Sequence, residues 1–126
     1  MRERKEVIDF CLGLNGTYED YPFHDFNWTV MRHKDNKKMF AAIYEHKGAI
    51  WVNVKCDPNL TYMWRNSFES VIPAYHMNKE HWISAVLSAV EDDKLRFLID
   101  MSWELTWPPR VLYNQRYHLP QAGRSE

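Results

Sequence analysis

The densest group of chemically capable side chains lies between residues 76 and 81. His76 and His81 supply imidazoles, and Lys79 adds a cation beside the amide of Asn78. These donors suit a small anionic ligand or a nucleotide, since polar groups on loops often serve binding. A structural role explains them equally well. Tyr75, Met77 and Trp82 would wedge the segment into the core, while the polar groups bond loop backbone.

Metal binding and nucleophilic catalysis are poorly supported by residue spacing. His76, His81, Cys56 and Asp57 are suitable ligand types, but no pair has the short spacing of zinc sites and no second pair completes four ligands. Cys11 is expected in a buried helix face, and the charge of Asp57 would raise the pKa of the neighbouring Cys56 thiol. Because the sequence shows no recognisable catalytic triad and no glycine-rich phosphate loop, we predict no catalytic residue, no metal and no cofactor.

A turn between two β-prone segments concentrates positive charge. Arg32 precedes this turn, and Lys34, Lys37 and Lys38 lie within it. Cations at a loop tip can neutralise the phosphates of a nucleic acid. Lysine-rich turns more commonly keep a sheet edge soluble and unpaired, and that role needs no partner.

Residues 49–55 alternate between apolar side chains and a second set, Trp51, Asn53 and Lys55. In a strand the two sets lie on opposite faces, so the apolar set would face the core and the second set would form an outward stripe. Such a stripe can stack on a base and contact a phosphate. The simpler interpretation is a solvated sheet face with one packed tryptophan.

Periodicity and turn chemistry predict the elements that position these residues. Apolar residues at helical spacing predict an amphipathic helix up to Leu14 that ends at Asn15-Gly16, followed by a polar and aromatic loop. The later elements are expected in this order: strands at 28–33, 39–44 and 49–55, a short helix after the Asp57 cap, an edge segment or connection at 71–75, a strand at 81–87, and a helix from Asp92-Asp93 to Trp107. The short helix is expected to bury the stripe Leu60, Met63, Trp64 and Phe68.

A strand meander with few helices predicts an α+β domain, in which an antiparallel sheet is packed by helices on one face. The other face would then meet solvent or a partner. We expect this domain to span residues 1–107. Residues 108–126 are polar and lack a sustained period, so they are expected to form a flexible tail.

Composition limits the function classes. The chain has 126 residues, 45% of them hydrophobic, which is typical of one folded domain. Its formal net charge of -1 gives no overall electrostatic field that would attract phosphates or anionic lipids. Nucleic-acid binding would therefore depend on local charge. Two cysteines without CxxC spacing, no apparent leader and no apolar run of about 20 residues favour reduced thiols, a cytoplasmic location and no membrane contact.

Four stretches carry a resemblance to a known family. They read KMFA at 38–41, VNVKCDP at 52–58, PAYHMNKEHW at 73–82 and LRFLIDMSWEL at 95–105. Together they resemble the MmcQ/YjbR family over roughly residues 1–107. The resemblance implies a CyaY-like fold, described as a possible double-wing DNA-binding module, with no established catalytic activity.

The leading hypothesis from the sequence is a non-enzymatic module that binds DNA or another nucleic acid through the turn lysines and the 51–55 face, with Lys79 and its neighbours as a second contact. The alternative is a protein–protein or small-ligand binding domain, with a homo-oligomer as one form of it. Its interface or pocket would be formed by four aromatic residues: Phe23, Phe26, Trp28 and Trp107. An enzyme would require His76 and His81 to form a titratable cluster in a closed cavity.

Overall fold

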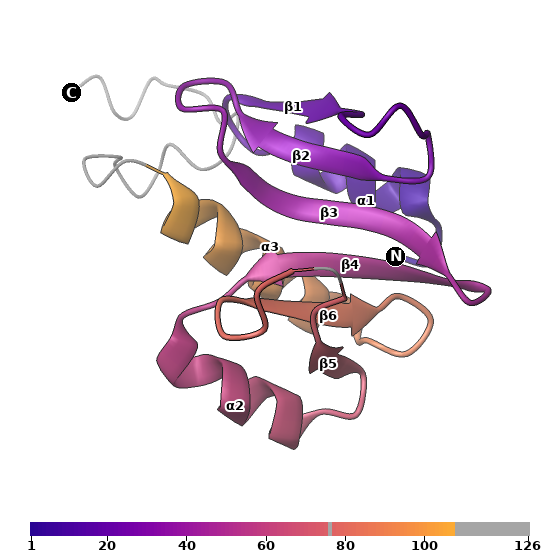
Figure 1. Ribbon diagram of the computed structural model, residues 1–126, viewed down its shortest axis with the longest axis vertical. Helices are drawn as coiled ribbons and strands as arrows, with labels where there is room; N and C mark the ends of the chain where they lie inside the picture. Colours follow the sequence, from indigo (N-terminus) through magenta and orange to yellow (C-terminus); the bar gives the residue numbers. More distant parts are fainter. Residues whose placement is uncertain (76, 108–126) are drawn as a thin grey trace.

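The computed structural model describes residues 1–75 and 77–107 and shows three helices and one sheet (Figure 1). The helices are α1 (Arg4–Leu12), α2 (Pro58–Ser67) and α3 (Asp92–Thr106). The strands are β1 (Thr17–Asp20), β2 (Thr29–His33), β3 (Met39–His46), β4 (Ala49–Lys55), β5 (Val71–Pro73) and β6 (Trp82–Val86). They pair antiparallel in the order β1-β2-β3-β4-β6-β5.

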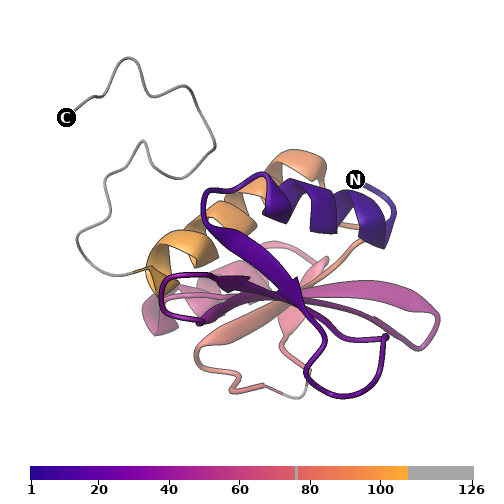
Figure 2. The ribbon, with the colours of Figure 1, turned by 90° about the horizontal axis from the view of Figure 1, so that it is seen from above.

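Helices α1 and α3 lie together on one face of the sheet (Figure 2). The opposite face carries no helix among the described residues, but two loops extend over it, residues 21–28 and the described part of residues 74–81 (74, 75 and 77–81). The predicted α+β class, with an antiparallel sheet and helices on one face, is confirmed. The more specific likeness to the CyaY fold stays a prediction.

The core fills the space between the sheet and these two helices. Val7 and Cys11 of α1 are fully buried there, together with inward residues of the central strands such as Val52 and Val54. Helix α3 contributes the face predicted from its spacing: Leu95, Leu98, Ile99 and Ser102 are all buried. Burial of this apolar face gives α3 most of its stability.

Two polar side chains inside this layer join elements far apart in sequence. The Ser102 hydroxyl donates to the Phe40 carbonyl at 2.6 Å and accepts from the Lys55 amide at 2.8 Å, so α3 is bonded to the ends of β3 and β4. The Arg4 guanidinium donates to the Ile43 carbonyl at 3.0 Å, to the Thr29 hydroxyl at 3.2 Å and to the Asn27 carbonyl. It thereby holds α1, the sheet and the end of the 21–28 loop together.

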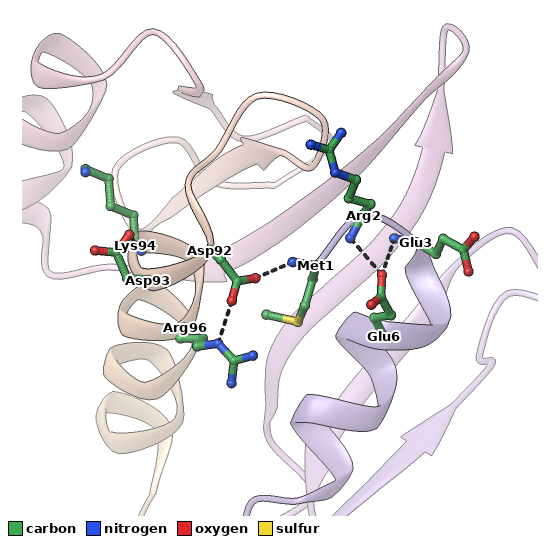
Figure 3. Close-up of polar contacts among 8 residues, drawn as sticks. All are labelled: Met1, Arg2, Glu3, Glu6, Asp92, Asp93, Lys94 and Arg96. Carbon is green, nitrogen blue, oxygen red and sulfur yellow. Dashed lines mark hydrogen bonds and ion pairs between the residues drawn. The ribbon is translucent and has the colours of Figure 1, made fainter.

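The first turns of α1 and α3 meet at a cluster of charges (Figure 3). Asp92 contacts the Met1 ammonium group and accepts from Arg96 Nε at 2.8 Å. These two hydrogen bonds lower the pKa of Asp92. The Glu6 carboxylate accepts from the amides of Arg2 and Glu3 at 2.8 and 3.0 Å, which satisfies backbone donors that the helix start leaves open.

Local expectations were wrong at two places in the first 20 residues. The first helix ends at Leu12 rather than Leu14, and the following segment, expected to be a loop, contains β1. The sequence of β1, Thr-Tyr-Glu-Asp, has little apolar signal because the strand lies at the edge of the sheet and, among the described strands, pairs only with β2. Gly16, with φ at 69°, allows the sharp entry into it.

The expected stripe of α2 is only partly buried. Trp64 is buried and contacts Phe68 and Phe97, whereas Leu60 and Met63 are 40% and 46% exposed. Helix α2 packs against β5 and β6 at the edge of the sheet, so the sheet covers only a narrow strip of its surface. The edge assignment of residues 71–75 is confirmed by β5, the outermost strand.

Three further observations bear on the expectations from sequence. No helix in the described part of the chain has both the length and the apolar character to cross a membrane. Cys11 and Cys56 are buried and form no disulfide. The tail predicted at residues 108–126 lies outside the described residues.

Candidate functional site

The face of the sheet opposite α1 and α3, called here the open face, is rich in aromatic rings. Trp28 stacks on Tyr44 with 3.8 Å between ring centroids, and His46 stacks on Tyr75 at 3.9 Å. Trp51 contacts the His46 ring edge-on at 4.9 Å. These five rings come from β3, β4 and both loops, so the open face carries a connected aromatic cluster around the fully buried Tyr44 rather than a solvated sheet with one packed tryptophan.

Asn53 lies on the open face, as the alternation of β4 predicts, but its side chain is fully buried. Its Oδ1 accepts from the Tyr44 hydroxyl at 2.9 Å and from the Ser84 hydroxyl, and its Nδ2 donates to the Tyr75 carbonyl at 3.1 Å. The prediction that Asn53 belongs to an outward binding stripe is therefore wrong. A buried amide must satisfy its hydrogen bonds inside the protein, and Asn53 does so by holding the 74–81 loop on the sheet.

The other two members of that stripe remain partly accessible. Trp51 is half-buried against its aromatic neighbours, and Lys55 is partly exposed at the end of β4. Covered Asn53 lies between them. The stripe is therefore interrupted, and a base stacked on Trp51 would meet the Tyr75 ring instead of the amide.

In the polar 76–81 group, the residues described by the structure have mostly local partners. The Asn78 carboxamide oxygen accepts from the Glu80 amide at 2.8 Å, and its carbonyl accepts from the Trp82 amide at 3.0 Å, so Asn78 builds the turn that leads into β6. The carbonyl of His81 accepts from the Cys56 amide at 2.8 Å. Lys79 is exposed at the tip of this turn. His76 lies outside the described residues.

Strand register brings the predicted lysines to one end of the sheet. Arg32 pairs with Met39 across the β2–β3 turn, and Lys55 pairs with Trp82 at the start of β6, next to the 78–81 turn. Because Val54 pairs with Ala41, the end of β4 lies beside the start of β3. We call this group, drawn from three separate segments, the lysine end: Lys34, Lys37, Lys38, Lys55 and Lys79.

Arg32 is not a free cation of this group. Its Nε donates to Asp20 at 2.8 Å, and its Nη1 donates to the Lys37 carbonyl at 3.0 Å. The Asn36 amide of the same turn donates to the Thr106 carbonyl at the end of α3 at 2.9 Å. Arg32 and Asn36 therefore brace the turn that carries the lysines.

The open face also contains a groove of about 340 Å³ between the two loops. Phe23, Asp25 and Trp28 line it from the first loop, Met39 from β3 and Met77 from the second loop. The rings of Phe23 and Trp28 meet nearly at right angles, at 82° with centroids 6.0 Å apart. Sequence reasoning missed Asp25, Met39 and Met77, because only tertiary structure brings the loops together.

The groove contains two of the four aromatic residues in the alternative hypothesis. Phe26 is 84% exposed and contacts Tyr21 instead. Trp107 lies on the helix side, stacked on Trp103 at 4.7 Å. A single pocket built from all four residues is therefore wrong, whereas a pocket at Phe23 and Trp28 exists.

The largest pKa shifts belong to His33, Cys11 and Cys56, which are buried in the core and do not line this groove. Burial lowers the pKa of His33 to about 4, and its Nε2 lies 2.7 Å from the Thr106 hydroxyl. Burial raises the pKa of Cys56 to about 11, with a further contribution from Asp57, as the sequence predicts. Across residues 1–75 and 77–107, no three His, Cys, Asp or Glu side chains form a group able to hold a metal.

One antiparallel sheet with helices on one face and loops on the other defines a small α+β domain. The chain belongs to the YjbR family, whose model matches residues 12–105. It is 33% identical over 118 residues to the uncharacterised protein YyaQ of Bacillus subtilis, a match that covers 84% of this chain and 99% of the relative. The uncharacterised YjbR of Escherichia coli is 26% identical over 100 residues, covering 79% and 82% of the two chains.

Solved structures show the same fold. A crystal structure of a protein from Pseudomonas syringae has a TM-score of 0.75 and 30% identity, covering 83% of this chain and 99% of that one. The Deinococcus radiodurans protein DR2400 has a TM-score of 0.77 and 24% identity, covering 91% and 86% of the two chains. The family and the fold are thereby established.

Proposed function

We propose that this chain is a non-enzymatic nucleic-acid-binding module that contacts phosphates through the lysine end. The observation that carries the proposal is the convergence of five lysines from three segments at one end of the sheet. None of the five forms an ion pair with a carboxylate within the residues that the structure describes. Their charges are therefore available to a polyanion.

The local charge balance supports this surface despite the net charge of -1. The same three segments contain Asp35, Asp57 and Glu80, so five lysines against three carboxylates leave an excess of two positive charges. A phosphate backbone can contact the lysines individually, and each contact releases condensed counterions. Binding would be weak at physiological salt and strong at low salt.

The lysines of the β2–β3 turn are held in place before any ligand arrives. Arg32 bonds the Lys37 carbonyl, and Asn36 bonds the end of α3, so the turn is attached on both sides. A braced turn loses less conformational freedom on binding than a free loop, which favours affinity. This turn is the part of the lysine end that we expect to contribute most.

The test is fluorescence anisotropy of labelled duplex and single-stranded DNA across a salt series. Lys37→Glu is the main variant, and Lys47→Glu is its matched control, because both lysines lie in hairpin turns with positive φ, 63° and 52°. Lys47 is in the β3–β4 turn at the opposite end of the sheet. Lys37→Glu should weaken binding and reduce the salt slope by about one, whereas Lys47→Glu should change neither.

Lys55→Glu should have the same effect as Lys37→Glu, because Lys55 is also part of the lysine end, although it lies in a different segment. If all five lysines contact duplex phosphates, the logarithm of the binding constant should fall with the logarithm of salt concentration at a slope of about -4.5. Absence of binding to either DNA at low salt would refute the proposal. Equal losses in the Lys37 and Lys47 variants would refute the assignment of the surface.

A further inference from the structure

We propose that the open-face groove is a second binding site, for a small organic cation that carries an ammonium or guanidinium group on an apolar body. The groove is lined by two aromatic rings, two thioethers and one carboxylate. Aromatic faces attract cations through the ring quadrupole, and a carboxylate balances the positive charge of the ligand and accepts its hydrogen bonds. This proposal is independent of the nucleic-acid proposal, which uses the lysine end.

The aromatic walls are held in position. Trp28 is stacked on Tyr44 with an interplanar angle of 12°, and the Tyr44 hydroxyl is bonded to buried Asn53. The Trp28 amide also bonds the Asp25 carbonyl at 3.4 Å. Phe23 meets Trp28 edge-on and is 60% exposed, so the two rings form a right-angled corner that a ligand can reach.

Charge decides which ligand suits this corner. Asp25 carries the one charge among the described residues that line the groove. One carboxylate oxygen accepts from the Asn27 amide at 2.7 Å, which orients the group, and the residue remains exposed. The neighbouring pair of Arg32 and Asp20 is neutral as a unit, so it does not cancel this negative charge.

Size indicates a free small molecule. A volume of about 340 Å³ falls at the lower end of small-molecule sites. The two methionines, from β3 and the second loop, offer flexible and polarizable walls that adapt to an apolar body. An aryl or alkyl group would lie against them while its cationic end lies near Asp25 and the rings.

The experiment compares phenethylammonium with 2-phenylethanol, which has nearly the same shape without the charge. The full chain is labelled with ¹³C in its methionine methyl groups, and the resonances of Met39 and Met77 are assigned by substitution. We expect phenethylammonium to shift both resonances in a saturable manner, with an affinity at least about tenfold higher than that of 2-phenylethanol. The other methionine resonances should stay in place.

Variants locate the site. Asp25→Asn and Phe23→Leu should each weaken phenethylammonium binding at least about fivefold, because each removes one element that recognises the cation. Asp35→Asn and Phe26→Leu are the matched controls, since both residues are exposed and lie outside the groove lining. Lys37→Glu should leave this binding unchanged, which separates the groove from the lysine end.

Three results would overturn the proposal. The first is equal affinity for the cation and the neutral alcohol, and the second is unchanged affinity in Asp25→Asn. The third is a tighter response to adenosine monophosphate or to an arginine-containing peptide than to phenethylammonium, which would assign the groove to an anionic nucleotide or to a protein partner.

Discussion

Replacing Asn53 with alanine tests the most specific difference between the sequence pattern and the structure. The alternation of β4 suggests a surface residue whose loss would affect only ligand binding. In the structure, the side chain is fully buried and makes hydrogen bonds to Tyr44, Ser84 and the Tyr75 carbonyl. Asn53→Ala should therefore destabilise the whole domain.

The magnitude follows from the three hydrogen bonds. Each is worth about 1 kcal/mol net, and buried partners left without a bond cost more than the average. Ser84 keeps one contact, since its Oγ accepts from the Tyr75 amide at 3.4 Å, whereas the Tyr44 hydroxyl loses its hydrogen bond to Asn53. We expect a loss of about 3 kcal/mol in the free energy of unfolding, which lowers the melting temperature of a domain this size by about 10 °C.

Urea and thermal unfolding followed by circular dichroism measure this loss directly. Asn66→Ala is the matched control, because Asn66 is exposed on α2 and its amide bonds only the Tyr62 carbonyl one turn earlier. It should change stability by less than about 0.5 kcal/mol. If Asn53→Ala melts within about 2 °C of the parent while DNA binding falls, the buried network is not stabilising and Asn53 is a contact residue.

Two further predictions concern buried titratable groups. Burial lowers the folded-state pKa of His33 to about 4, below the ordinary 6.5, so the unfolded chain binds a proton there that the folded chain excludes. The stability of the domain should be fully present above about pH 6.5 and fall toward pH 4, by up to about 3 kcal/mol; an NMR titration of the His33 imidazole with a midpoint near 6.5 would contradict this. Burial raises the pKa of the Cys11 and Cys56 thiols, so neither should react rapidly with a thiol reagent at pH 8 until the chain is unfolded in urea, and fast labelling of the native protein would disprove it.

Much of the local structure could be predicted because it depends on short-range chemistry. The span of β4 was predicted to the residue, since strict alternation and the flanking turns mark both ends. The start of α2 followed from the Asp57 cap, whose side chain accepts from the Asn59 amide at 2.8 Å. Strand β1 could not be predicted in this way, because its pairing with β2, not its composition, makes it a strand.

The sequence by itself determined the fold class, the inward faces of β4 and α3, and the presence of lysines in two turns. Only the tertiary structure decided that Asn53 is covered, that Arg32 is paired with Asp20, and that Asp25 lies in a groove with two methionines. The physical reason is that alternation specifies the face on which a side chain lies, but segments distant in the chain decide what covers that face. Asn53 bonds groups 9, 22 and 31 residues away, and no local pattern records those contacts.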